Sequence, residues 1–312
     1  MELQEPKVYI VVLNYNNWQD TIECLESIYS SDYKNYNIVV VDNSIDNNSI
    51  DRLQAWARGK LIFEASPFVS SFVPKPIDYK LFHEEEIKKI EPSRLTFIKA
   101  ENRGYAAGNN VGIQYALLQG DMKYVWLLNN DTVVQRDTLS MMVQSTQKNS
   151  KIGAVGSIQY YYHEPHKIQS AGGGFSKYRA HFWNINKLDF KQDELAYIYG
   201  ASMLLTKKVI QEVGLLSEDY FIYYEEIDYM HRMKEKGFLP HVNKEAKIYH
   251  KHSSTISKEG EEFRLFHLEK GKLIFYKKFY PNLLFIPIAK IFWKFLKSGK
   301  KVYLKALQVG LK

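Results

Sequence analysis

The sequence predicts an α/β protein with a mostly parallel central sheet flanked by helices. Two apolar, β-branched runs at residues 8–13 and 37–41 enclose a segment, residues 18–30, whose apolar side chains recur at helical spacing. A crossover of this length makes the two strands parallel and places the helix on one face of the sheet. Residues 124–128 are again apolar throughout, as expected for a strand buried on both faces.

The rest of the chain continues this alternation after one interruption. Residues 64–93 are rich in proline and charge, and we expect a long, partly ordered surface insertion there. Further elements are then expected in this order: a strand at 95–98, a helix ending near 118, a strand at 124–131, a helix at about 137–147, a strand at 153–158, a glycine-rich loop at 171–175, a strand at 197–205, and helical structure from 263 onward.

Polar side chains directly follow three of the predicted strands. In open α/β sheets, ligands bind at the carboxyl ends of the strands. Asn129 and Asp131, two residues apart, offer oxygen atoms to a hard cation such as Mg²⁺ or Mn²⁺. Ordinary turn chemistry is the alternative, because Asn and Asp are also favoured in turns. The polar residues at these strand ends are Asn14 and Tyr15, then Asp42, then Asn129, Asn130 and Asp131.

Residues 101–110, ENRGYAAGNN, combine glycines with amides. Gly104 and Gly108 permit a close approach of backbone to a ligand, and Asn102 offers an amide contact to a sugar or base. A helix start rich in capping residues explains the same pattern. The turn after the first strand reads NYNN and lacks the G-x-G-x-x-G of dinucleotide-binding proteins, and no P-loop is present.

Three carboxylates stand where an aromatic run gives way to a helix, in FIYYEEIDYMHR. Glu225, Glu226 and Asp228 there complement a helix dipole, or one of them is a general base whose solvation the aromatic residues restrict. Further on, His250 and His252 share one face of a predicted strand, a pattern that is more often structural than functional. Upstream, Trp183 lies in a mixed polar and aromatic segment that suits an acceptor-sugar surface or an ordinary loop.

The net charge of +7 is concentrated in the tail. Residues 260–312 hold 12 Lys and Arg against 3 Glu, whereas the remainder, with 30 basic and 32 acidic residues, nearly balances. This distribution argues against a nucleic-acid-binding body and for a tail that meets something anionic. Five lysines, Lys290, Lys294, Lys297, Lys301 and Lys305, recur at intervals of 4, 3, 4 and 4. We expect one basic helical stripe on a membrane surface or, alternatively, a charged face packed on the body.

The remaining sequence features are consistent with a cytoplasmic protein. Cys24 is the only cysteine, so an intramolecular disulfide is excluded and a reducing compartment is favoured. No secretory signal pattern is visible, and no run of 18 apolar residues predicts a spanning helix. Together with the basic tail, this predicts a peripheral position at the inner face of the cell membrane.

In their order and spacing, these motifs resemble the family 2 glycosyltransferases of the GT-A fold, particularly the rhamnosyltransferase-like members that build bacterial surface polysaccharides. The resemblance covers about residues 7–255 and excludes the insertion and the tail. It implies a glycosyltransferase domain over residues 1–258 and a separate helical, basic extension over residues 259–312. The motifs that carry it are VVLNYNN, VVVDNS, ENRGYAAGNN, WLLNND, YGASMLL, FIYYEEIDYMHR and the YHKHSS histidines.

The resemblance also assigns roles to the candidate residues. Glu226 occupies the second acidic position of the family's Glu-Asp pair, the catalytic base, and Asn129 replaces an Asp of the metal motif. These two departures leave Glu225 and Asp228 as candidates for part of the base role and predict a weakly charged metal site. The implied groups are donor-binding Asn14, Tyr15, Asp42, Asn102, Gly104 and Asn130, metal-binding Asp131, Asn129 and His250, and catalytic Glu226, Glu225 and Asp228.

The implied reaction is an inverting transfer of a sugar from a nucleotide-diphosphate donor. Glu226 would deprotonate the acceptor hydroxyl, and Asp131 with a divalent cation, Mg²⁺ or Mn²⁺, would neutralise the departing diphosphate. A dTDP-rhamnose or UDP-sugar donor and a lipid-linked saccharide acceptor fit the resemblance and the tail. Two alternatives stay open: a sugar nucleotidyltransferase, which should carry a glycine-rich basic loop after the first strand, and a non-catalytic saccharide-binding protein, which would not need Glu226 and Asp131 together.

Overall fold

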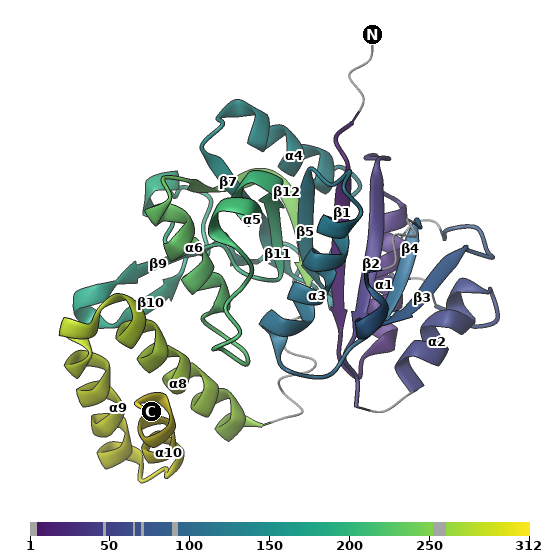
Figure 1. Ribbon diagram of the computed structural model, residues 1–312. Helices are drawn as coiled ribbons and strands as arrows, with labels where there is room; N and C mark the ends of the chain where they lie inside the picture. Colours follow the sequence, from purple (N-terminus) through teal and green to yellow (C-terminus); the bar gives the residue numbers. More distant parts are fainter. Residues whose placement is uncertain (1–4, 46–47, 65, 70–71, 89–92, 252–259) are drawn as a thin grey trace.

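The computed structural model places a helix-flanked sheet above a lobe of C-terminal helices (Figure 1). It describes residues 5–45, 48–64, 66–69, 72–88, 93–251 and 260–312. His252 and the domain boundary predicted at residue 258 lie outside this part of the chain.

Ten of the described strands form the main sheet, and it is mostly parallel, as the sequence predicts. Strands β3, β4, β2, β1 and β5 all run parallel, whereas β11, β6 and β8 run antiparallel to their neighbours. In spatial order the strands are β3 (Tyr79–His83), β4 (Leu95–Lys99), β2 (Tyr36–Asp42), β1 (Val8–Asn14), β5 (Tyr124–Asn129), β11 (Ser202–Thr206), β7 (Ile152–Tyr161), β12 (Leu239–His250) and β6 (Thr132–Val134), with β8 (Ile168–Ser170) beside β7.

The strand register brings the predicted polar residues to one edge of this sheet. Asn14 at the end of β1 lies opposite Asp42 at the end of β2. On its other side β1 pairs with β5, where Leu13 lies opposite Asn129. Because parallel strands end at the same edge, residues far apart in the sequence become neighbours there.

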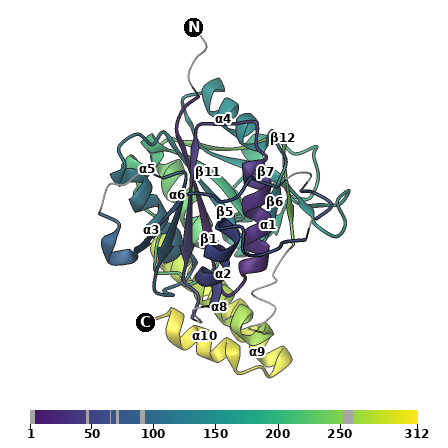
Figure 2. The same ribbon diagram turned by 90° about the vertical axis from the view of Figure 1, so that its right-hand side faces the viewer.

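Helices cover both faces of the sheet because the side chains of each buried strand alternate between two cores. Tyr9 and Val11 of β1 point into one core, and Val8, Ile10 and Val12 point into the other. Figure 2 shows α3 and α1 on opposite sides of β1. The first core is covered by α3 (Tyr105–Leu118), α5 (Lys207–Val213) and α6 (Glu225–Glu235), and the second by α1 (Trp18–Tyr29), α2 (Asn48–Ala57) and α4 (Thr138–Lys148).

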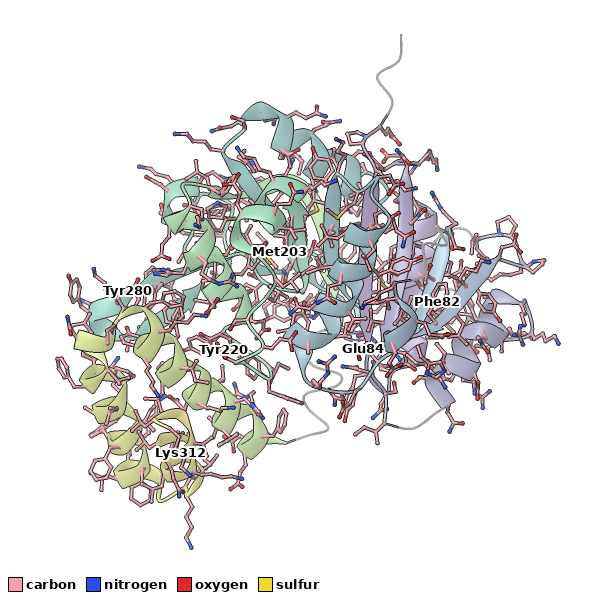
Figure 3. The ribbon with its side chains drawn as sticks, in the orientation of Figure 1. Phe82, Glu84, Met203, Tyr220, Tyr280 and Lys312 are labelled. Atoms are coloured by element: carbon pink, nitrogen blue, oxygen red, sulfur yellow. The ribbon has the colours of Figure 1, made fainter. Side chains whose placement is uncertain are left out.

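Three sequence expectations differ from the structure. The insertion at residues 64–93 supplies β3, the edge strand of the sheet, whose Phe82 is buried against the first core (labelled in Figure 3). The glycine-rich loop predicted at 171–175 instead enters β9 (Gly173–Ser176), which pairs with β10 (His181–Asn184) because small glycines accept the neighbouring aromatic rings. The strand predicted at 197–205 begins only at Ser202.

The C-terminal residues fold as three helices, α8 (Glu261–Phe279), α9 (Phe285–Ser298) and α10 (Val302–Gly310). Phe275 and Tyr276 of α8 pack against the body, and Tyr280, labelled in Figure 3, contacts Phe175 of β9 with ring centroids 5.8 Å apart. The predicted single lysine stripe is wrong, because Gly299 adopts φ 69° and divides the stripe between two helices. No helix in the described ranges is long and apolar enough to cross a bilayer.

Candidate active site

A cavity of about 590 Å³ opens at the carboxyl edge of the sheet, between the ends of β1 and β5, the N-terminus of α6 and the first turns of α8. Its described lining includes the carboxylates of Asp131, Glu225 and Glu226, the imidazole of His250 and the guanidinium of Arg264. Nine of the predicted site residues line the cavity, whereas Asn14, Asp42 and Asp228 do not; the nine are Tyr15, Asn102, Gly104, Asn129, Asn130, Asp131, Glu225, Glu226 and His250.

Asn14 and Asp42 form a buried polar network behind the cavity wall. Asn14 Nδ2 donates to Asp42 Oδ1 at 2.7 Å, and Asn14 Oδ1 accepts from Thr21 Oγ1 at 2.8 Å. Asn130 Nδ2 also lies 3.2 Å from Asn14 Oδ1. Desolvation raises the pKa of Asp42, an effect opposed by hydrogen bonds from Ser44 and Asn14. These amides therefore hold the ends of three strands together.

The adjacent rim of the cavity is formed by Tyr15, Asn43 and Asn102. Asn43 Nδ2 donates to Asn102 Oδ1 at 3.4 Å, while Asn43 Oδ1 is buried with no hydrogen-bond partner among the described residues. A buried acceptor without a partner beside a cavity is suited to a ligand donor. Sequence reasoning missed Asn43, although it directly follows Asp42 in the motif VVVDNS.

Gly104 lets α3 approach the segment that precedes α6. Its φ is +101°, and a Cβ there would lie 2.2 Å from Phe221 O. The next residue, Tyr105, donates its amide to the same carbonyl at 2.7 Å. The Tyr105 hydroxyl lies 3.0 Å from Asn129 Oδ1, so the N-terminus of α3 also positions the end of β5. Gly104 thus shapes the cavity through its backbone.

Asp131 and His250 converge on the cavity from β-strand ends that are distant in sequence. His250 Nε2 lies 3.1 Å from Asp131 Oδ1, and His250 Nδ1 lies 2.7 Å from Gln169 Oε1. The amide of Gln169 holds the imidazole ring so that Nε2 is directed at the carboxylate of Asp131. A carboxylate beside an imidazole oriented by a second partner suits a divalent cation.

The described part of the chain holds no cluster of three or more His, Cys, Asp or Glu residues that could enclose a metal ion. Asp131 and His250 offer two ligands, which fits a cation that takes its other ligands from substrate phosphates and water, the usual arrangement for Mg²⁺. Asn129 is a weaker third candidate, because its Oδ1 already faces the Tyr105 hydroxyl.

Glu225 and Glu226 begin α6 after two strained residues. Tyr223 and Tyr224 both have positive φ, 67° and 77°, which is rare outside glycine and typical of constrained functional segments. Desolvation raises the pKa of Glu226 to about 7 and that of Glu225 well above its ordinary value, and the two carboxyl groups are hydrogen-bonded. The Oε2 atom of each is buried with no partner among the described residues.

Asp228, the third candidate carboxylate, is turned away from the cavity. It is fully buried and pairs with Arg232 at 2.6 Å and with Lys278 of α8 at 2.8 Å, while the Tyr220 hydroxyl donates to it at 3.2 Å. Two cations and a hydroxyl occupy its oxygens, and one of those cations belongs to another helix. Asp228 therefore fastens α8 to α6.

Residues beyond the predicted site complete the cavity. Phe263, Arg264 and Leu268 reach it from the first turns of α8, so the C-terminal helices form part of its wall. Trp183 of β10 lines it too, with its ring lying against Gly174, where a Cβ would be 2.1 Å from the ring. The sequence marks Trp183 only within a mixed polar segment, and no local pattern identifies Arg264.

Residues 83–214 match the family model of Glycosyl transferase family 2. The low-salt glycan biosynthesis hexosyltransferase Agl10 of Haloferax volcanii is 24% identical over 139 residues, which is 44% of this chain and 45% of that protein. The chain spans less than half the length of the curated relatives it matches.

Two solved structures share the fold. A mannosyltransferase from Pyrobaculum calidifontis, in complex with GDP-Man and Mn²⁺, has a TM-score of 0.57 at 16% identity and matches 98% of this chain and 80% of its own. GalNAc-T7 with UDP, GalNAc and Mn²⁺ has a TM-score of 0.57 at 11% identity and matches 80% and 44%. Residues 83–214 are therefore similar to family 2 glycosyltransferases, and the fold is the GT-A fold of the two solved structures.

Proposed function

We propose that this protein is an inverting glycosyltransferase that moves a sugar from a nucleotide-diphosphate donor to a saccharide acceptor. The observation that carries the proposal is Glu226, a carboxylate in the cavity with a pKa of about 7 and a buried oxygen that has no partner among the described residues. A general base is most effective when its pKa is close to the working pH. Asp131 and His250 line the same cavity, so the proposed base and the proposed cation ligands face one cavity.

In this proposal Glu226 takes the proton of an acceptor hydroxyl as that oxygen bonds to the anomeric carbon. The bond between the anomeric carbon and the diphosphate oxygen breaks on the opposite side, and the nucleoside diphosphate leaves with the bonding electrons. Glu225 keeps its proton and donates it in the hydrogen bond to Glu226, which holds the base in position. Asp228 has no direct part, since its oxygens are engaged by Arg232 and Lys278.

A divalent cation, Mg²⁺ or Mn²⁺, would be held by Asp131 and His250, with Asn129 as a weaker ligand. When bound, it would supply positive charge to the diphosphate as negative charge develops there. The likeness to structures solved with Mn²⁺ supports this assignment without choosing between the two metals. Tyr15, Asn43, Asn102 and the backbone at Gly104 would bind the nucleoside, while Asn14, Asp42 and Asn130 fix the shape of that wall.

Arg264 is the one Arg or Lys side chain in the described lining of the cavity, which otherwise carries three carboxylates. A nucleotide-diphosphate is an anion, so we assign Arg264 to its phosphates. Replacing Arg264 by Gln should raise the KM for the donor at least tenfold with little change in kcat, and Lys should restore part of the affinity. An unchanged donor KM would remove Arg264 from this role.

For the substrates, we propose dTDP-rhamnose or a UDP-sugar as donor and a lipid-linked saccharide as acceptor, in the synthesis of a surface or cell-wall polysaccharide. The hexosyltransferase relative, the structure with GDP-Man and the structure with UDP and GalNAc support a hexose donor in this class. Residues 1–258 would carry the transfer, and the extension from residue 259 would supply Arg264 and hold the protein at the inner face of the membrane.

The test begins with a panel of nucleotide sugars scored by thermal shift with and without Mn²⁺, because a donor that binds the folded state stabilises it. The donor that stabilises is then used in a transfer assay with wild-type protein, Glu226→Gln, and Glu245→Gln as a control on an exposed position of β12. We expect Glu226→Gln to lose about 10²–10⁴-fold in kcat while its donor shift is retained. Near-normal turnover of Glu226→Gln would reject the base, and the absence of any stabilising donor would reject the function.

A further inference from the structure

The outward face of α9 is apolar. Four large side chains, which we call the apolar ridge, are exposed along it: Phe285 at 66%, Phe292 at 47%, Trp293 at 61% and Leu296 at 64%. Their positions, at intervals of 7, 1 and 3, fall on one side of an α-helix. Large apolar side chains contiguous on a surface mark an interaction site far more often than scattered single ones do.

The ridge is additional to the face that α9 needs for folding. Ile291 of α9 is fully buried with Leu273 of α8 and with Val302 and Tyr303 of α10. This inner contact already fixes the helix on the lobe (Figure 1). The opposite side of a helix packed in this way is normally polar, so the apolar outward face requires another explanation.

The charge around the ridge identifies the kind of partner. Residues 285–312 contain seven lysines and no Asp or Glu. Lys294 and Lys300 pair with Glu269 and Glu261 of α8, at 2.6 and 2.7 Å. Lys297 and Lys301 are exposed and make no ion pair with any described residue, and the Lys297 ammonium lies 5.3 Å from the centre of the Trp293 ring. An aromatic and leucine face bordered by lysines that have no acidic partner among the described residues suits an anionic lipid surface.

We propose that α9 lies in the interface of an anionic bilayer, with the apolar ridge at the acyl boundary and Lys297 and Lys301 among the headgroups. A second copy of this chain is a poorer occupant, because pairing two ridges would bring lysines against lysines without a carboxylate from this segment. The 14 residues of α9 span about 21 Å, less than the hydrocarbon core, so the helix lies along the surface and does not cross it. Contact with the bilayer therefore depends on the apolar ridge of α9, and not on the single lysine stripe expected from the sequence.

Two contacts connect this surface to the cavity. Lys290 of α9 donates to Arg179 O, in the hairpin whose Trp183 lines the cavity. Lys294 pairs with Glu269 of α8, directly after Leu268 in the cavity wall. If the proposed transfer holds, a bilayer under α9 would therefore keep the acceptor side of the cavity near lipid-linked saccharides.

The experiment is co-sedimentation of the full chain, without nucleotide, with vesicles of phosphatidylcholine alone or with 30% phosphatidylglycerol added. We expect wild-type protein to bind the anionic vesicles and a Phe292→Gln/Trp293→Gln/Leu296→Gln variant to bind at least tenfold more weakly. A matched control, Ile62→Gln/Phe72→Gln, removes exposed apolar side chains elsewhere and should bind as wild type does. Circular dichroism and thermal unfolding would show that each variant is folded.

A Lys297→Gln/Lys301→Gln variant separates the two contributions. It should lose most of the preference for phosphatidylglycerol, because each lysine near an anionic surface favours binding. Equal vesicle binding by the ridge variant and wild type would overturn the proposal, as would a wild-type protein that ignores anionic vesicles. Sedimentation velocity covers the second-copy outcome: a wild-type dimer that the ridge substitutions dissociate, without vesicle binding, assigns the ridge to self-association. Because no substrate is present, failure here is distinct from failure of the glycosyltransferase assay.

Discussion

Replacing Glu226 by glutamine should change how the stability of the protein depends on pH. Burial raises the pKa of this carboxyl from its ordinary 4.5 to about 7. The folded chain therefore binds more protons than the unfolded chain between these two values, so the free energy of unfolding falls as pH rises through that window. The contribution is fully present below pH 4.5 and is lost above pH 7. A rise of this size corresponds to at most about 3 kcal/mol.

Glutamine cannot ionise, so the Glu226→Gln variant lacks this pH-dependent contribution to the free energy of unfolding. The substitution also removes negative charge beside Glu225, whose pKa is raised by burial and by Glu226. Between pH 5 and pH 8, wild-type protein should lose more stability than Glu226→Gln by up to about 3 kcal/mol, or roughly 4 °C in Tm for a chain of this size. The absolute Tm is less informative, because the amide introduces a donor at a site where Glu226 Oε2 already lacks a described partner.

Thermal unfolding at half-unit steps from pH 5 to pH 8 measures this difference, with Glu245→Gln as the exposed control. The same samples give a second readout, because kcat/KM of wild-type protein should fall about tenfold for each pH unit below 7 as the base becomes protonated. If the Tm of wild-type protein and of Glu226→Gln changes in parallel with pH, the raised pKa of the Glu226 carboxyl is refuted. A flat activity profile through pH 6–7 would refute its role as base even if the stability result holds.

Three further predictions follow from single contacts. Gly104→Ala should destabilise the fold by about 2 kcal/mol and weaken donor binding, because the added Cβ would collide with Phe221 O at a residue with positive φ. Urea unfolding and donor titration measure the two effects, and an unchanged free energy of unfolding with unchanged donor affinity would contradict the close approach. Asp228→Asn should lower the free energy of unfolding in urea by about 3 kcal/mol, because it removes the buried carboxylate charge that pairs with Lys278 and Arg232, whereas an effect below 1 kcal/mol would contradict its role in fastening α8 to α6. Trp183→Ala should raise the KM for the acceptor while leaving the thermal shift caused by the donor unchanged. A loss confined to donor binding would instead place the Trp183 ring on the donor side of the cavity.

The local patterns of the sequence predict much of the sheet. Continuous apolar runs identify β1, β2 and β5, because strands buried on both faces leave no room for polar positions. Edge strand β3 escapes this reasoning, since most of its side chains are exposed and its sequence resembles that of a loop. The break between α9 and α10 is similarly hidden, because regular lysine spacing continues across Gly299.

What the sequence by itself determined is the class of fold and the edge of the sheet where polar residues gather, since both follow from strand periodicity and from chain direction. Which of those residues face the cavity was decided only by tertiary packing. The Asn14 side chain is hydrogen-bonded within a buried network, and Asp228 forms an ion pair with Lys278 of α8. Arg264 lines the same cavity as Gly104 at the N-terminus of α3, although it lies 160 residues further along the chain. Side-chain partners of this kind depend on distances between elements, which no local pattern of residues encodes.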